Sequence, residues 1–365
     1  MLVERKNATA RRLGGELPAF SDTLGPLQEW QPNWLPLSHG RAALAWWLQR
    51  QPARSVALCA YLCPSVPTFL RKRSIAIGTY DVGADVKEVS ALVHQLPSPR
   101  IVIVPALFGS SPWIDIPSLV DELDSTDRVI IDAAQSAFGH VEFTPPTGGA
   151  VLSCPRKSTS LTDGAILAVS TATGAREEID QLPVAAFSAA MKAAARALWT
   201  TEDASLEQQA IIYNRLSEES WPDSPHRMTD QSLALLQRLN RDWHVEKRRY
   251  NCNLLTQSLP ENLPAFRGVG GTPFSLPVFV ADPATTLSEL HRRRIFASRL
   301  WPDAEYDPER HPAAEWIAEH LVSLPIDQRC DADDMKRISV AIAEVAKPPS
   351  QVCPQALRRF IFTRQ

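Results

Sequence analysis

RVIIDAAQS, at residues 128–136, and AVLSCPRK, at residues 150–157, are the two stretches that decide the fold. Each begins with an apolar run and ends in polar residues, which is the pattern of a buried parallel strand followed by a turn. In open α/β sheets, ligands bind beyond the carboxyl ends of such strands. The pattern therefore predicts that Asp132 and Lys157 lie at the same edge of one sheet.

A carboxylate and a lysine at one edge of a sheet match the needs of a particular cofactor. Pyridoxal 5'-phosphate (PLP) is held as a Schiff base by a lysine, and an acidic partner keeps its ring nitrogen protonated. The lysine can move protons once a substrate displaces it. Taken singly, Asp132 is more simply interpreted as a helix cap and Lys157 as a solvated loop residue. Taken together, they favour a cofactor site.

The motifs around this pair resemble those of the DegT/StrS family of PLP-dependent sugar aminotransferases, which have the aspartate aminotransferase fold (fold type I). That family shows Asp-Ala-Ala followed by His or Gln, then a serine a few residues before a lysine, then a glycine-containing turn. The matching stretches here are DAAQ at 132–135, SCPRK at 153–157 and DG at 163–164. The resemblance implies a Schiff base on Lys157 and a cofactor ring held by Asp132 and Gln135.

Contacts to the cofactor phosphate also follow from the resemblance. Ser153 is expected to bind the phosphate through its hydroxyl. Gly40 and Arg41 open a predicted helix, whose free backbone N–H groups form a ready anion site. The alternatives are an ordinary helix start that binds nothing and an Arg41 that pairs with a carboxylate elsewhere. Arg156 either lowers the pKa of the neighbouring lysine by charge repulsion or faces away from it.

Two aromatic residues complete the predicted cofactor site. Tyr61 follows the strand predicted at 55–60 and is expected near the cofactor, with a core aromatic as the alternative. Phe108 follows the apolar strand predicted at 100–104 and is a candidate stacking residue, because the resembled family has an aromatic-glycine pair at this point.

The order of elements predicts an α/β fold. Strands and helices alternate up to residue 170, which implies a parallel sheet with right-handed crossovers. We expect an N-terminal arm at 1–36, a large PLP-binding domain at 37–230 with a mostly parallel sheet flanked by helices, and a smaller C-terminal α+β domain at 231–365. One long helix from Asp230 to about Leu255 is predicted to open the small domain.

Composition excludes several classes of protein. The net charge of −3 argues against a nucleic-acid surface, and no apolar run approaches the length that spans a membrane. The first six residues include Glu4, Arg5 and Lys6 and lack the apolar core of a signal peptide. The six cysteines are scattered without a Cys-x-x-Cys pair, so we expect no metal site, no disulfides and a cytoplasmic location.

One part of the sequence departs from the resembled family. Many members carry a Gly-x-Asn-x-Arg segment whose asparagine reaches the phosphate bound by the partner subunit. The corresponding place here reads SPHRMT at 224–229. The cross-subunit contact is therefore in doubt, with His226 and Arg227 as alternative phosphate ligands.

The function implied by the resemblance is amino transfer. An amino-acid donor would supply the amino group to a keto acceptor, a keto-sugar usually carried on a nucleotide, in a homodimer with its active site at the interface. Two alternatives stay open. A PLP-dependent elimination is disfavoured because Lys157 is present, and a non-catalytic binding or regulatory role is disfavoured because Asp132, Gln135, Ser153 and Lys157 are all intact.

Overall fold

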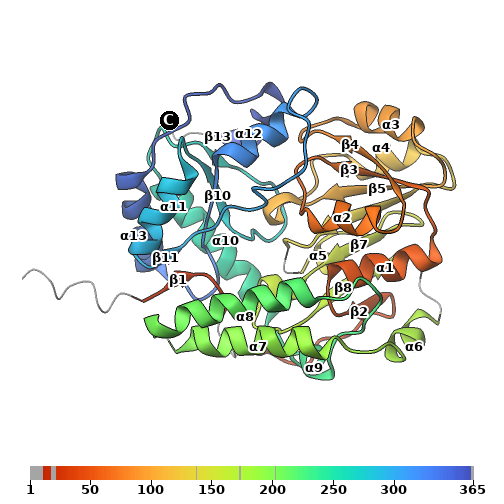
Figure 1. The fold of residues 1–365 in the computed structure, drawn as a ribbon, viewed down its shortest axis with the longest axis horizontal. Helices are drawn as coiled ribbons and strands as arrows, with labels where there is room; N and C mark the ends of the chain where they lie inside the picture. Colours follow the sequence, from red (N-terminus) through yellow and green to blue (C-terminus); the bar gives the residue numbers. More distant parts are fainter. Residues whose placement is uncertain (1–10, 18–21, 137, 172–173, 202, 363–365) are drawn as a thin grey trace, which may run out of the picture.

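The protein folds into two parts, one built around a seven-stranded sheet and one around a four-stranded sheet (Figure 1). A computed structural model describes residues 11–17, 22–136, 138–171, 174–201 and 203–362. Residues 1–10 and 18–21 of the predicted arm lie outside the described residues.

The seven-stranded sheet is mostly parallel. Its order is β2 (Trp34–Leu37), β8 (Ala165–Val169), β7 (Ala150–Ser153), β6 (Arg128–Ala133), β5 (Arg100–Pro105), β3 (Ser55–Cys59) and β4 (Ala76–Tyr80). The five strands from β7 to β4 pair in parallel, whereas β8 is antiparallel to both of its neighbours. The carboxyl ends of the five parallel strands therefore form one shared edge.

Helices cover both faces of this sheet, because its central strands bury alternate side chains on opposite sides. Val56 and Leu58 pack in one core with α1 (Gly40–Arg50) and α2 (Ser65–Arg71). Ala57 and Cys59 pack in another core with α3 (Val86–His94) and α4 (Ile116–Asp121). Shorter elements follow individual strands, namely η1 (Leu107–Gly109), α5 (Gly139–Glu142), η2 (Pro155–Lys157) and α6 (Ala175–Asp180).

The C-terminal part packs helices on an antiparallel sheet of order β12-β10-β9-β13. Its strands are β9 (Ala265–Phe266), β10 (Leu276–Phe279), β12 (Leu321–Leu324) and β13 (Ile361–Phe362), and its helical elements include α11 (Pro283–Arg292), α12 (Pro312–His320), α13 (Ala332–Val345) and η4 (Gln355–Leu357). Near the N-terminus, β1 (Leu13–Gly14) pairs in parallel with β11 (Ile295–Phe296) of this part.

The long helix predicted from Asp230 is two helices, α9 (Asp230–Leu236) and α10 (Arg241–Ser258). The break lies at Asn240, whose side chain accepts a hydrogen bond from the Trp243 N–H at 3.1 Å and so caps the second helix. The Asn240 N–H donates to the Thr23 carbonyl at 2.9 Å. A cap residue inside an apolar pattern marks this boundary, which the helical periodicity alone did not reveal.

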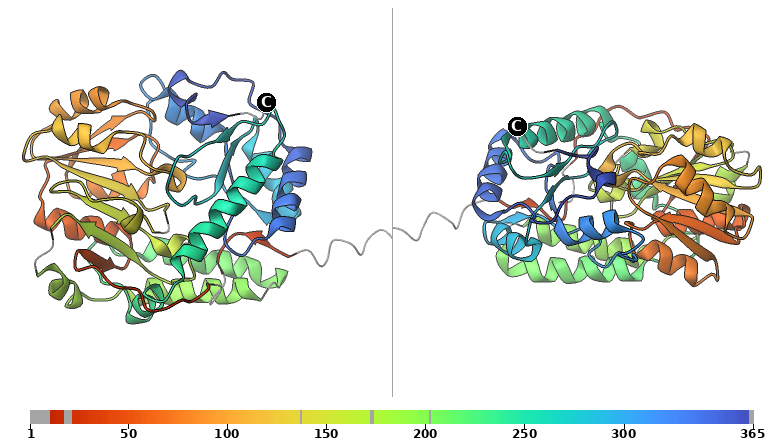
Figure 2. Two further views of the ribbon diagram at one scale, coloured as in Figure 1. Left: turned by 180° about the vertical axis from the view of Figure 1, so that it is seen from behind. Right: turned by 90° about the horizontal axis from the view of Figure 1, so that it is seen from above.

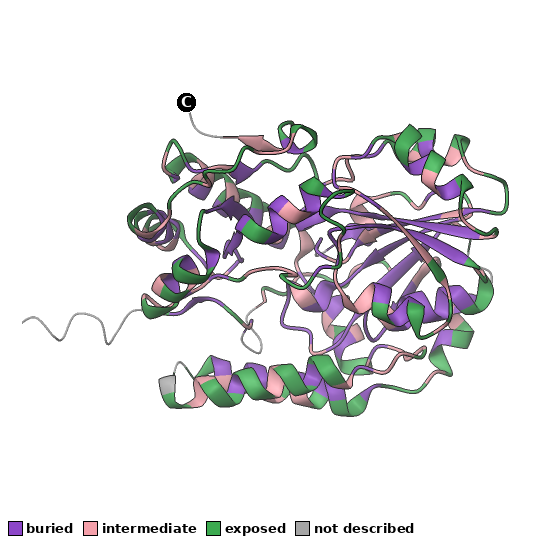
Figure 3. Ribbon diagram, turned by 45° about the horizontal axis from the view of Figure 1, so that its top comes forward, coloured by how far each residue is buried: buried purple, intermediate pink, exposed green. Residues whose placement is uncertain are grey.

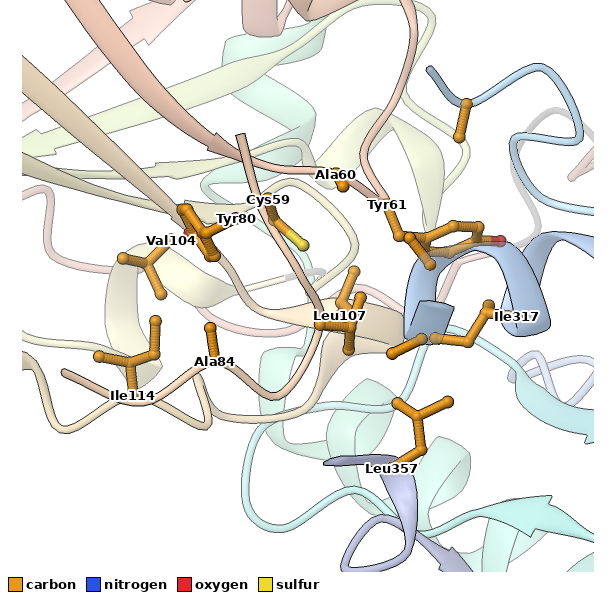
Figure 4. Packing of buried hydrophobic residues seen from close by; sticks show 14 of the residues in the cluster. Cys59, Ala60, Tyr61, Tyr80, Ala84, Val104, Leu107, Ile114, Ile317 and Leu357 are labelled. Atoms are coloured by element: carbon orange, nitrogen blue, oxygen red, sulfur yellow. The ribbon is translucent and has the colours of Figure 1, made fainter. Parts of the chain in front are cut away.

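The two parts share a continuous apolar core (Figure 4). Tyr61 and Leu107 of the first part lie in one cluster with Ile317 of α12 and Leu357 of η4. Asp81 ties the same interface, because its carboxylate accepts hydrogen bonds at 2.9 Å from the N–H groups of Ala313 and Ala314 at the start of α12. The edge of the sheet is thereby held at a fixed distance from the C-terminal part.

An antiparallel pair of helices, α7 (Ala186–Thr200) and α8 (Glu207–Ser220), runs along one side of the molecule beneath both parts (Figures 1 and 2). The short η3 (Ala204–Leu206) connects them. Their outer faces are exposed, whereas β3, β5, β7 and β8 of the large sheet are buried along their whole length (Figure 3). Within the described ranges, no helix combines the length and apolar character needed to cross a membrane.

Candidate active site

A cavity of about 110 Å³ lies at the carboxyl ends of the parallel strands. Its walls come from β5, β6 and β7 with the turns that follow them, from α1, α2 and α8, and from Trp301 of the C-terminal part. The residues that define its chemistry are His39, Gly40, Arg41, Cys63, Asp132, Gln135, Cys154, Arg156, Lys157, Glu218 and Trp301. The structure thus brings together four of the residues predicted to bind the cofactor with the predicted catalytic lysine.

Asp132 is the penultimate residue of β6 and lines the cavity. It is half-buried, and its Oδ1 accepts a hydrogen bond from the Ala134 N–H at 3.0 Å. Burial raises the pKa of the Asp132 carboxyl, while the positive charge of Lys157 and the hydrogen bond from Ala134 lower it in part. The carboxylate is therefore costly to ionise unless a positive group comes beside it.

Lys157 ends η2, directly after β7. Its backbone N–H donates to the Cys154 carbonyl at 3.0 Å, which fixes the turn. The side chain is half-buried and forms no hydrogen bond or ion pair with any residue that the structure describes. Its amino group is therefore held at the cavity wall without a competing partner.

Lys157 also lines a second cavity, of about 100 Å³. This one lies between residues 14–17 and the C-terminal part. Its polar walls include Arg248, Ser275, Ser323 and Asp327, all of which are buried. One lysine thus lines two cavities of similar size.

Gln135 lines the first cavity, and a backbone hydrogen bond holds its side chain in place. Its Oε1 accepts a hydrogen bond from the backbone N–H of Phe108 at 2.7 Å. Phe108 itself has a φ of 56° and packs its ring against Phe266 at 4.9 Å. Phe108 lies in the apolar core and is not part of the cavity wall, so it acts on the site only through its backbone hydrogen bond to Gln135.

Tyr61 is likewise a core residue in this structure. Its hydroxyl donates to the Leu300 carbonyl at 2.6 Å, and it contributes no atoms to the cavity wall. Trp301, whose ring lies 5.4 Å from that of Tyr61, lines the cavity instead. The aromatic side chain at the site therefore comes from the C-terminal part.

Gly40 and Arg41 stand where the first turn of α1 meets the cavity. Arg41 Nε pairs with Asp223 Oδ1 at 3.0 Å, which matches the carboxylate alternative for this arginine. A methyl group at Gly40 would lie 3.4 Å from the Cys154 sulfur, so the helix start is close against the turn after β7.

Ser153 lies outside the cavity wall. It is fully buried, and its Oγ is 2.8 Å from Nδ1 of His140. His226 and Arg227, the alternative phosphate ligands, are also not part of the wall. Arg227 forms an ion pair with Asp230, and Nδ1 of His226 is hydrogen-bonded to the Ser224 carbonyl.

Five of the residues that define the chemistry of the cavity were not predicted to belong to it, namely His39, Cys63, Cys154, Glu218 and Trp301. His39 directly precedes the predicted helix start, so the Ser-His-Gly order was a usable signal. Glu218 lies on α8, in a region that showed only surface character. Arg156, which was left between two roles, lines the wall and pairs with Glu218 through both terminal nitrogens, at 2.8 and 3.1 Å.

Buried histidines make the fold sensitive to acid. Burial lowers the pKa of His140 to about 3, with a smaller contribution from the charge of Arg241, and lowers the pKa of His244 to about 4 against the opposing charge of Asp22. The pKa of His39 is also well below its ordinary value, first because of burial and then because of Arg156.

We expect the melting temperature to fall as the pH decreases from about 7 to 5. A depressed histidine pKa contributes stability that is present above the unfolded pKa of about 6.5 and is lost below it, by up to about 1.4 kcal/mol per pH unit for each group. His140→Gln should make the decline shallower, whereas the same change at the exposed His94 should not. Identical pH profiles for wild type and His140→Gln, measured by circular dichroism, would contradict this.

The comparisons with known proteins define a fold class. No protein-family model and no curated protein matches the sequence. Solved structures of aminotransferases match the fold at low identity, and the predicted α/β class with its mostly parallel sheet is confirmed.

Three of these structures illustrate the match. DesI, solved in the presence of its TDP-sugar product, is 14% identical, with a TM-score of 0.55 over 85% of this chain and 80% of its own. The sugar aminotransferase CalS13 from Micromonospora echinospora is 14% identical, with a TM-score of 0.56 over 86% and 87%. A DegT DnrJ EryC1 StrS aminotransferase from Brucella abortus is 13% identical, with a TM-score of 0.55 over 85% of both chains.

Proposed function

We propose that the protein is a PLP-dependent aminotransferase that transfers an amino group from an amino acid to the keto group of a nucleotide-linked sugar. The observation that carries the proposal is the placement of Asp132 and Lys157 on one cavity at the carboxyl ends of adjacent parallel strands. The printed descriptions of DesI and CalS13, a TDP-sugar product and a sugar aminotransferase, support the choice of acceptor.

The residues of the cavity fit the cofactor. Asp132 has Oδ2 without a hydrogen bond among the described residues, so it can accept one from a protonated ring nitrogen. Lys157 offers an amino group without a competing partner, and α1 presents its N-terminal turn to the same space. A carboxylate, an amine and an anion-binding helix start are the three groups that the cofactor requires.

When bound, the cofactor supplies an electron-accepting ring that stabilises negative charge on a substrate carbon. Asp132 would keep the proton on the ring nitrogen, since burial makes its charge favour a cationic neighbour. Lys157 would hold the cofactor covalently and later carry a proton to and from the substrate. Gln135, fixed by the Phe108 N–H, would contact the ring.

We further propose that the second cavity receives the substrates. Lys157 lines both cavities, so a substrate in the second one would lie beside the lysine that holds the cofactor in the first. The hydroxyls of Ser275 and Ser323 suit a polyhydroxylated acceptor.

We also propose that the protein is a cytoplasmic homodimer. The free cysteines support the cytoplasmic location. The exposed apolar side chains of Ile211, Ile212 and Leu216 on α8 support a subunit interface.

The proposal is tested by the two halves of the reaction. Protein loaded with PLP is mixed with single amino acids, and the matching 2-oxo acid is measured by mass spectrometry. At least one amino acid is expected to yield its oxo acid in a single turnover and to change the visible spectrum. Nucleotide-linked keto-sugars are then added, and the amino-sugar product is sought. Protein that binds PLP but turns over no donor would favour a non-catalytic role, and release of a dehydrated product would favour elimination.

A further inference from the structure

We propose that Arg156 and His39, together with the N-terminal turn of α1, bind the phosphate group of the cofactor within a single chain. This inference rests on the proposed function, since it assigns the ligands of the cofactor that the function requires. It replaces Ser153 and the 224–229 segment, neither of which lines the cavity. Unpartnered buried groups, the geometry of Arg156 and a surplus of positive charge support this assignment.

His39 offers the first unpartnered group. It is 2% exposed, lines the cavity and stacks on Trp221 with ring centroids 5.0 Å apart. Its Nδ1 lies 2.9 Å from the Ser38 hydroxyl, whereas its Nε2 has no hydrogen-bond partner among the described residues. A buried ring nitrogen without a partner is costly, and an anion that accepts from Nε2–H removes that cost. The Ser38 hydroxyl then donates to Nδ1.

The N-terminal turn of α1 stands beside this histidine. His39 is the residue that precedes the helix, with an extended backbone, and no side chain caps the turn. Gly40 and Arg41 both line the cavity, so the N–H groups of the first turn lie at its wall. Uncapped N–H groups at the positive end of an 11-residue helix bind phosphate oxygens well.

Arg156 contributes the charge. It is 6% exposed and lines the cavity beside Lys157. Glu218 holds its two terminal nitrogens, and the guanidinium lies 5.1 Å from the centre of the Trp221 ring. Its Nε is buried and has no hydrogen-bond partner in the described part of the chain. The arginine is therefore fixed in place with one donor still available.

The ion pairs around Arg156 leave positive charge uncompensated. Arg156 and Lys192 share Glu218, while Lys192 and Arg196 share Glu16. Three buried cations thus face two carboxylates, of which Glu218 is 43% exposed. A phosphate group carries close to two negative charges at neutral pH, so it would balance this surplus.

The test compares PLP with pyridoxal, which has the same ring and aldehyde but no phosphate. Dissociation constants of both are measured by tryptophan fluorescence for wild type, Arg156→Gln and His39→Asn. Loss of one hydrogen bond to a charged group weakens binding by about 10- to 100-fold. We expect that loss for PLP and little change for pyridoxal in both variants. Arg100→Gln and His320→Asn serve as controls, because Arg100 and His320 are buried, hydrogen-bonded and outside the cavity.

The outcomes separate this inference from the proposed function. Variants that lose PLP and pyridoxal affinity equally, or lose neither, would overturn the phosphate assignment while leaving a PLP site in place. Wild-type protein that binds neither compound would overturn the proposed function itself. Equal losses in the control variants would show a general effect on the fold and would also count against the assignment.

A second measurement does not depend on variants that fold. Inorganic phosphate is titrated into wild-type protein together with each compound. Phosphate should compete with PLP, because both need the same ligands, but should not compete with pyridoxal. Competition with both compounds, or with neither, contradicts a phosphate site in this cavity.

Discussion

Replacing Lys157 by alanine should abolish the covalent attachment of the cofactor. Wild-type protein with added PLP is expected to be yellow, and borohydride should fix the cofactor to Lys157, where peptide mass spectrometry can find it. Lys157→Ala should show neither the colour nor the adduct. Amino transfer should fall by about 10²- to 10⁴-fold or more, because the variant loses its proton carrier as well as its covalent anchor.

Two further variants sharpen this result. Lys157→Arg keeps the positive charge near Asp132 but offers no amine for the covalent bond, so it should behave like Lys157→Ala in the borohydride experiment. Lys72→Ala removes an exposed lysine that pairs with Asp223 outside the cavity. This variant should still form the borohydride-fixed adduct on Lys157. An adduct at any other lysine in the wild type would contradict the assignment of Lys157.

Replacing Asp132 by asparagine should separate binding from chemistry. The amide has nearly the same shape but no negative charge, so it cannot hold the proton on the ring nitrogen. The covalent adduct on Lys157 should still form. Amino transfer should fall by about 10²- to 10³-fold, the usual loss when one electrostatic contact to developing charge is removed. Single-turnover formation of the 2-oxo acid measures the effect directly.

The same substitution should not destabilise the protein without cofactor. Burial raises the pKa of Asp132, so the folded chain holds this proton more tightly than the unfolded chain. The resulting stability is present below the unfolded pKa of about 4 and is lost as the pH rises through the folded pKa. At neutral pH the ionised carboxylate therefore costs stability, and Asp132→Asn should melt at the same temperature or higher.

Asp81→Asn is the matched control for this pair of effects. Burial raises the pKa of Asp81 too, but its oxygens accept backbone hydrogen bonds at the start of α12. The Asp81→Asn substitution should lower the melting temperature and leave the visible spectrum of the PLP-loaded protein unchanged. A marked loss of melting temperature in Asp132→Asn, with full amino transfer, would mean that Asp132 has a structural role only.

Sequence patterns predicted those cavity residues that lie directly after a strand or at the start of a helix. Apolar runs that end in polar residues placed Asp132 and Lys157 at one edge of the sheet, because parallel strands deliver their carboxyl ends together. Gln135 and Gly40 follow from the same logic, since each lies within a few residues of a strand end or a helix start. Local pattern is sufficient where the backbone alone sets the position.

The rest depends on tertiary packing that no local pattern encodes. Glu218 meets Arg156 from a helix far along the chain, and Trp301 arrives from the C-terminal part. Ser153 is the last residue of β7, and its Oγ is engaged by His140, a residue separated from it by a loop. Which of two neighbouring polar groups faces a cavity is decided by such distant partners.

The parallel pairing of β1 with β11 has a consequence for how the chain is made. Leu13 and Ile295 are partners although almost the whole chain separates them, and Arg12 also binds the Trp199 carbonyl and Glu207. On the ribosome, residues 11–17 wait about 15 to 60 seconds for β11 to emerge, at usual elongation rates. The pairing of β1 with β11 therefore forms late in synthesis, after most of the other elements have emerged.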